Sequence, residues 1–365
     1  MIVILLHEMA HAATVDNRSL RANASRVAES PNSLHSGLMP TDPLSPDALL
    51  RIVEQVKEYY VEPSPRRLRG RPRTFSGRAF LLLAVVAVVL RTFKSQELHT
   101  LLGKDARLQQ ALGLVRVPHR RTLERRLPAT LPEAEAQVRA LGQQILAEVE
   151  PGPEAPQASA IDGRMYQAQG PLWHARDREQ NRVPSGLRNL DTESAWSKSG
   201  YRGWVQGYRL VLQGLVFPAP VPLFARWCPN SVGESTVLEE ALAAAQLPIT
   251  ELLLGDSTFG GADRVAAYAR HGGWLLAPQQ LPANPASWKQ DLYAYRRETI
   301  ELLFQRIMQT CDLTACPTKG LARNGTFVIA SVWLYQVLFL CNYRQRRPYA
   351  HIKEFIDEAR WRIAA

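Results

Sequence analysis

Cysteines and long apolar runs are scarce in this sequence, and their scarcity limits the classes of protein that it can represent. Only four cysteines occur, no two form a CxxC pair, and no secretory signal with a basic start is present. We therefore expect the thiols to pack as small apolar residues in a reducing cytoplasm, with neither a zinc site nor a disulfide. The longest apolar run, Ala79 to Leu90, is shorter than the roughly 20 residues of a membrane span and predicts a buried core helix.

Acidic residues are also fewer than basic ones. The chain has 34 Asp and Glu against 44 Lys and Arg, which gives a net charge of +10. This excess favours a polyanionic partner, with nucleic acid ahead of an anionic membrane surface. The 365 residues allow two domains, and 46% hydrophobic with 21% charged residues is the composition of a folded globular protein.

The first residues contain a metal-binding pattern. His7, Glu8 and His11 match HExxH, in which two histidines on one helix face bind zinc and the glutamate acts as general base. No xxGxxH continuation follows, and the residues up to Pro43 are rich in Ser, Asn, Ala and Pro without periodicity. A zinc protease is therefore the weakest alternative. We expect residues 1–44 to be a disordered or spurious extension, with Met39 as an alternative start.

Residues 45–150 read as a helical DNA-binding domain. Ser45 supplies an N-cap for a helix that reaches about Tyr60, and further helical patterns cover 76–102, 106–112, 122–127 and 133–149. Several short helices that end in a basic one are typical of a helix-turn-helix, whose last helix enters the major groove. In the basic helix at 122–127 we expect the leucines to face a core while Arg125 and Arg126 face outward.

An arginine-dense stretch without acidic residues lies between the first and second of these helices and is broken by proline and glycine. It is expected to lie as an arm on DNA phosphates, with a solvated basic linker as the alternative. The predicted DNA contacts of this domain are Arg66, Arg67, Arg69, Arg71, Arg73, Arg120, Arg121, Arg125 and Arg126.

Three prolines between 151 and 156 mark a boundary, beyond which strands alternate with helices. Strands are expected at 161–166, 204–215, 221–227, 252–255 and 274–277, helices at 235–245 and 262–270, and a long polar loop at 173–202. This alternation predicts an α/β sheet covered by helices over 157–347, mostly helical from residue 297, followed by a helical tail over 348–365.

Two predicted strands end in a carboxylate followed by glycine. Asp162 follows a small-to-apolar segment, Asp256 follows the run Leu252 to Leu254, and Glu301 lies in an amphipathic helix. Three such acids can hold divalent metal ions for phosphodiester chemistry. Two alternatives stay open: Asp256 as a mere helix cap, and Glu298 in place of Glu301.

The segment 76–345 resembles the DDE transposases of bacterial insertion sequences. The matching motifs are Ile161-Asp162-Gly163, Gly203 to Leu210, Gly255 to Phe259, and Arg297-xxx-Glu301-Leu302-Leu303-Phe304. The spacings of 94 residues (256 − 162) and 45 residues (301 − 256) also agree. Many relatives carry a tyrosine and a lysine where this sequence has Ala294 and Met308, so those two auxiliary contacts are not carried over.

The resemblance implies a fold, a metal and a reaction. The fold is an α/β ribonuclease-H-like mixed sheet flanked by helices and preceded by an all-helical DNA-binding domain. Asp162, Asp256 and Glu301 would bind Mg²⁺ or Mn²⁺, and Arg297 would contact phosphate. The expected activity is cleavage at the element's ends and strand transfer into target DNA.

The partners that the resemblance implies are double-stranded DNA, as transposon ends and target, and a second copy of the chain in a homodimer. The expected location is the bacterial cytoplasm, in association with the nucleoid and with no membrane. Two alternatives share the fold: a DNA nuclease without strand transfer, and a catalytically inactive DNA-binding copy.

Overall fold

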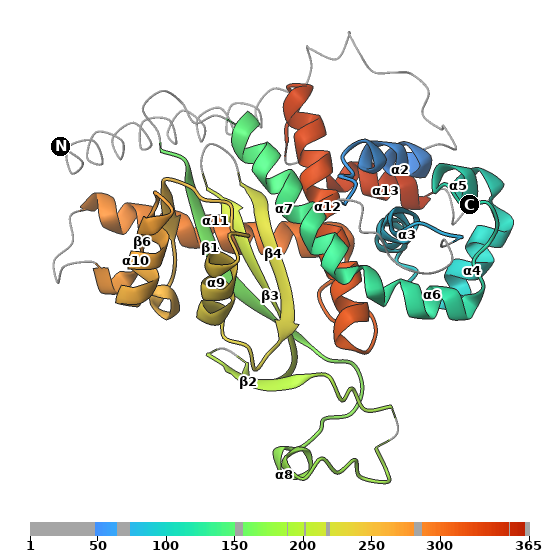
Figure 1. Ribbon diagram of the computed structural model, residues 1–365, viewed down its shortest axis with the longest axis horizontal. Coiled ribbons are helices and arrows are strands. Elements are labelled where there is room, and N and C mark those ends of the chain that lie inside the picture. The colour runs from blue at the N-terminus through green and yellow to red at the C-terminus, as the bar shows by residue number, and fades with distance from the viewer. Residues whose placement is uncertain are drawn as a thin grey trace, which may run out of the picture.

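The computed structural model describes residues 48–63, 74–149, 156–187, 189–200, 202–216, 220–280, 287–349 and 351–361 (Figure 1). The HExxH match and the arginines from Arg66 to Arg73 lie outside these residues. The helices that precede the sheet are α2 Ala48–Glu58, α3 Gly77–Leu90, α4 Ser95–Lys104, α5 Ala106–Ala111, α6 Arg120–Arg126 and α7 Leu131–Glu148, with a short 3₁₀ turn at Pro128–Thr130.

Helix α3 is the predicted core helix, and local chemistry sets both of its ends. Ser76 caps its N-terminus by accepting a hydrogen bond from the amide of Ala79. At the other end Arg91 adopts a left-handed conformation with φ 55°, and the chain turns by 98° into α4. The single helical stretch predicted over 76–102 is therefore two helices.

A six-stranded mixed sheet follows. Its strands are β1 Ala158–Gln167, β2 Ala195–Ser199, β3 Gly203–Leu215, β4 Val221–Pro229, β5 Leu252–Leu254 and β6 Trp274–Leu276. β3 pairs antiparallel with β1 on one edge, and with β2 and then β4 on the other, while β5 is parallel to both β1 and β6. Three long antiparallel strands joined to two short parallel ones make a mixed α/β sheet, which confirms the predicted fold class.

Alternate strand residues face two helical layers, as the period of a strand requires. Ile161 and Leu253 contact the layer formed by α9 Glu234–Ala243 and α10 Ala262–Arg270. Their neighbours Ala160 and Leu254 belong to the larger core, which includes α11 Ser287–Cys311, α12 Leu321–Arg344 and α7. The sheet is therefore covered on both faces (Figure 1).

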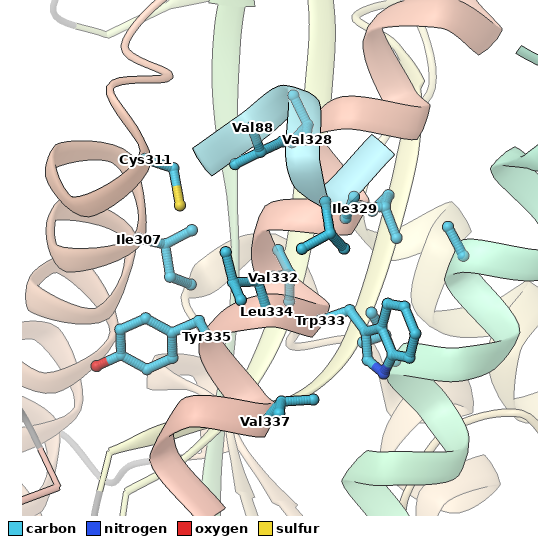
Figure 2. Packing of buried hydrophobic residues seen from close by; sticks show 14 of the residues in the cluster. Val88, Ile307, Cys311, Val328, Ile329, Val332, Trp333, Leu334, Tyr335 and Val337 are labelled. Atoms are coloured by element: carbon cyan, nitrogen blue, oxygen red, sulfur yellow. The ribbon is translucent and has the colours of Figure 1, made fainter. Parts of the chain in front are cut away.

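Helix α12 is the centre of the larger core. Val332, Trp333 and Leu334 are fully buried, and Figure 2 shows neighbouring side chains from α3 and α11 around them. By length and composition α12 could cross a membrane, but 94% of its most apolar 18-residue stretch is buried inside the protein. The four cysteines are free thiols; Cys311 lies beside this cluster, and only Cys341 is partly exposed.

The larger core continues across the predicted boundary at 150–157. α7 and α12 pack against each other and against β4, and α12 also contacts α3. The last described helix, α13 Lys353–Trp361, returns to α2 and α3, where Arg360 donates a 2.6 Å hydrogen bond to the carbonyl of Val89. The predicted domain ranges stay predictions, but the two ranges share one continuous core.

Between β1 and β3 the chain leaves the sheet and returns. The segment that was expected to be loop-like contains a short helix, α8 Ala175–Glu179, and the strand β2. Asp191 fixes its return by accepting hydrogen bonds from the Tyr208 hydroxyl at 2.7 Å and the Gly320 amide at 3.0 Å. This segment projects beyond the sheet in Figure 1.

Candidate metal centre

Asp162 and Asp256 lie side by side because their strands are parallel neighbours. Ala160 of β1 is in register with Leu254 of β5. Asp162 follows Ala160 by two residues, and Asp256 follows Leu254 by two residues. Neighbouring strands are about 4.8 Å apart, so the geometry of the sheet alone brings these carboxylates together. Asp256 also accepts a 2.7 Å hydrogen bond from the amide of Thr258, so it caps the following turn and remains at the site.

A third carboxylate reaches the same place from the opposite face of the sheet. Glu234 is the first residue of α9, and its ligand oxygen lies within 4.8 Å of those of Asp162 and Asp256. A side chain at Gly163 would occupy its space, since a Cβ built there would lie 2.5 Å from the Glu234 carboxyl carbon. The glycine after Asp162 therefore leaves room for Glu234. No sequence signal distinguished Glu234 from an ordinary acid in the first turn of a helix.

Burial makes Asp162 and Glu234 hard to ionise. The pKa of Asp162 is raised to about 6, chiefly by burial and also by the charges of Asp256 and Glu301, while the Gly163 amide and Arg296 oppose this shift. Burial likewise raises the pKa of Glu234 to about 7, against the lowering effect of Arg209. Near neutral pH the cluster consequently retains protons that a divalent cation would displace.

Two buried arginines approach the cluster, one from each face of the sheet. Arg209 on β3 lies 3.4 Å from Glu234, and Arg296 on α11 lies 4.0 Å from Asp162. The Nε and Nη1 atoms of Arg296 have no hydrogen-bond partner within the described part of the chain, although the residue is only 8% exposed. Its guanidinium also lies 5.8 Å from the ring of Tyr293.

Tyr293 connects α11 to the strand that precedes Asp256. Its single hydroxyl proton is shared between the carbonyls of Gly255, at 2.5 Å, and Leu276, at 3.2 Å. Tyr293 and Arg296 thus bring the start of α11 to the acidic cluster. Neither was selected from the sequence, where the adjacent Arg297 fitted the motif.

The predicted pair Arg297 and Glu301 lies on the outer side of α11. Their side chains are 62% and 60% exposed and form an ion pair at 3.1 Å. Glu301 is not among the three clustered carboxylates, but it is near enough for its charge to raise the pKa of Asp162. The alternative, Glu298, is exposed on the same helix. Glu301 and Arg297 therefore stay predicted site residues.

The described arginines of the helical region differ in orientation. Arg120, Arg121 and Arg125 are exposed on α6, as predicted. Arg126 instead lies half-buried, with its guanidinium 4.8 Å from the ring centre of Phe80. It follows the buried Leu123 by three residues, which places it on the inward face of the helix.

Comparisons with known proteins give a structural similarity but no sequence match. No protein-family model matches the sequence, and no curated protein matches it. Among solved structures, the chain is similar to the piggyBac transposase in a cryo-electron microscopy structure of its synaptic complex with hairpin DNA. The similarity covers 89% of this chain and 82% of that chain, at 12% sequence identity and a TM-score of 0.38.

Proposed function

We propose that this protein is a DNA transposase of the DDE type. It cuts phosphodiester bonds at the ends of an insertion sequence and joins the cut ends to target DNA. The observation that carries the proposal is that ligand oxygens of Asp162, Asp256 and Glu234 lie within 4.8 Å of one another, where two core strands meet the start of α9. The motifs that surround these aspartates and the net charge of +10 support DNA as the substrate.

The donor set fits a hard divalent cation. It contains only carboxylate oxygens, which suit Mg²⁺ or Mn²⁺, and the pKa values of Asp162 and Glu234 are raised chiefly by burial, which the neighbouring arginines do not offset. Asp162, Glu234 and Asp256 would hold one ion, and Glu301 together with Asp162 would hold a second ion. Such ions activate the attacking oxygen and stabilise the leaving oxygen of a phosphodiester.

The protein's own contribution is to bind and orient the phosphate. Arg296 is buried beside Asp162, and its Nε and Nη1 atoms have no hydrogen-bond partner among the described residues, so it can donate hydrogen bonds to a phosphate at the cluster. Arg297 would contact phosphate farther out, because it is exposed on the next position of the same helix. Arg209 would hold Glu234 in place, on the face of the sheet opposite to Arg296.

The remaining parts of the proposal concern the assembly. The exposed arginines of α6 and the arginine-dense arm would bind the DNA ends through phosphates. Two copies would act on paired ends in the bacterial cytoplasm, in association with the nucleoid.

Cleavage of the element's own terminal DNA tests the proposal. We expect wild-type protein to nick labelled end duplexes only with Mg²⁺ or Mn²⁺. The variants Asp162→Asn, Glu234→Gln and Asp256→Asn should lose nicking by about a hundredfold or more while still binding DNA. Glu240→Gln, an exposed acid on the same helix as Glu234, is the matched control and should cut normally.

Glu301→Gln decides whether the fourth acid belongs to the site. Loss of nicking would assign Glu301 to the metal centre, whereas normal nicking would limit the centre to the three clustered residues. If wild type and all variants bind DNA but none of them nicks it, the transposase proposal would be rejected in favour of an inactive DNA-binding copy.

A further inference from the structure

A two-stranded ribbon projects past the end of the sheet. β2 pairs with Gly203 to Gly207 of β3, whereas the pairing of β1 ends at Gly207 and that of β4 at Tyr208. Among the strands, residues 203–206 of β3 are thus paired with β2 alone. We refer to Ala195–Ser199 together with residues 203–207 as the β2–β3 ribbon.

Side-chain hydrogen bonds hold the base of the ribbon in place. The buried Gln206 accepts a 2.6 Å hydrogen bond from the Trp173 amide and donates one of 2.7 Å to Ser194 Oγ. The Trp196 indole donates to the carbonyl of Trp173 at 2.6 Å, and Asn230 donates to the carbonyl of Val205 at 3.2 Å. The ribbon is therefore a fixed extension of the sheet.

The tip of the ribbon combines a large aromatic surface with positive charge. Trp204 is 67% exposed, Lys198 lies directly opposite it on the same face, and Arg202 occupies the turn. Within the described residues, the side chains of Lys198 and Arg202 have no ion pair or hydrogen bond. No acidic residue occurs between Glu193 and Glu234 in the sequence, so no neighbouring side chain along the ribbon neutralises this charge.

The register of the sheet gives the spacing between this tip and the acidic cluster. Asp162 is paired with Leu212, and Trp204 precedes Leu212 by eight residues (212 − 204) on β3. At about 3.3 Å per residue, this separation is roughly 26 Å along the strand. The same length corresponds to about eight base pairs of duplex DNA, at about 3.4 Å each.

We propose that the tip of the β2–β3 ribbon binds duplex DNA about eight base pairs from the phosphate at the acidic cluster. Lys198 and Arg202 contact backbone phosphates, and Trp204 packs against a sugar or base. A two-stranded ribbon fits the major groove, and an exposed tryptophan beside two cations is an amphipathic contact surface for it. This inference rests on DNA as the substrate of the proposed function.

Binding without metal tests the ribbon separately from catalysis. The affinity for a fluorescein-labelled duplex of about 30 base pairs is measured by anisotropy in EDTA over a range of salt concentrations. Lys198→Ala with Arg202→Ala should reduce the slope of log affinity against log salt by about 1.8, because each phosphate contact contributes about 0.9. Trp204→Ala should weaken binding at least about fivefold.

A matched control comes from the opposite edge of the sheet. Trp274 is 49% exposed on β6 and Arg270 is exposed on α10, so Trp274→Ala with Arg270→Ala removes a similar surface elsewhere. This variant should bind as wild type. Circular dichroism and sedimentation of every variant verify that the fold and the oligomeric state are unchanged.

The outcomes separate the ribbon from the active site. Ribbon variants that bind as wild type, or that lose no more affinity than the control, would overturn the inference. A changed oligomeric state with unchanged DNA affinity would also overturn it and assign the tip to a protein contact. If wild type fails to cut DNA but the ribbon variants weaken binding as expected, the proposed function fails while the ribbon assignment stands.

Discussion

At the scale of residues, the acidic cluster stores electrostatic repulsion that a bound cation would relieve. Asp162, Glu234 and Asp256 share a half-buried site, and the two nearby arginines leave the pKa values of Asp162 and Glu234 raised. A site optimised only for stability would neutralise these charges. The excess of negative charge is therefore a feature of a binding site and should be visible as a cost to the metal-free fold.

Asp162→Asn should stabilise the metal-free protein at pH 8 by about 1–3 kcal/mol. The pKa of Asp162 is raised from 3.8 to about 6 in the folded state, so between these values the native state binds more protons than the unfolded state. The free energy of unfolding contributed by this group consequently falls as pH rises through the window, and the difference should vanish near pH 4. Urea unfolding in EDTA at pH 8 and pH 4 measures the stability difference between wild type and variant. A variant less stable than wild type at pH 8 would contradict the prediction.

Gly163→Ala should weaken Mn²⁺ binding about tenfold or more, because the new methyl group displaces the Glu234 carboxylate. Gly200→Ala is the control, since a Cβ at Gly200 meets no atom of the described residues within 4 Å. Isothermal titration with Mn²⁺ measures both affinities. Equal affinities in the two variants would remove Glu234 from the metal centre.

The two aspartates were predictable from the sequence, whereas Glu234 and Arg296 were not. Asp162 and Asp256 follow apolar strands, and strand ends are local signals that one sequence carries. Glu234 approaches from the far face, and Arg296 depends on how α11 is rotated against the sheet. Both positions are set by tertiary packing, which local patterns do not encode.

At the scale of elements, close backbone packing decides where helices meet the sheet. Gly142 of α7 is buried against β4, and a Cβ there would lie 2.7 Å from the carbonyl carbon of Leu223. Gly103 of α4 is exposed, and no atom in the described part of the chain would lie within 4 Å of a Cβ built there. The same substitution should therefore have opposite effects in the two helices.

Gly142→Ala should destabilise the protein by about 2 kcal/mol or more, since backbone atoms cannot move aside as a flexible side chain would. Gly103→Ala should stabilise it by about 0.5–1 kcal/mol through the higher helix propensity of alanine. Urea unfolding of the two variants measures both values. A neutral Gly142→Ala variant would show that α7 and β4 can separate at little cost.

Element boundaries were predictable wherever hydrophobic periodicity ended at glycine or proline. The helix at 262–270 and the strands at 204–215 and 221–227 agree with the structure within about two residues. The break at Arg91 was missed because the left-handed C-cap of α3 is an arginine, whereas glycine is the residue that usually signals such a turn in a sequence. β2 was missed because its polar sequence forms a strand only through pairing with β3.

At the scale of the whole molecule, the helical region and the sheet stabilise each other. α12 follows the sheet in sequence, yet it packs against α3 and α7 and fills the core between them and β4. A fragment of residues 45–150 lacks this helix and exposes the apolar faces that it covers. We expect that fragment to lack a cooperative thermal unfolding transition by circular dichroism, whereas residues 45–365 should show one. A cooperative transition of the short fragment would establish an independent domain.

The buried thiols can serve as chemical probes of how often this shared core opens. Burial raises the pKa of Cys228 to about 11 and those of Cys311 and Cys316 to about 12, and these three residues lie in β4, at the end of α11 and in the segment before α12. Because the thiolate is the reactive form, all three are shielded from alkylation by burial and by protonation. Their modification rates therefore report how often distant parts of the molecule open, and equal rates would mean that sheet and helices come apart in a single event.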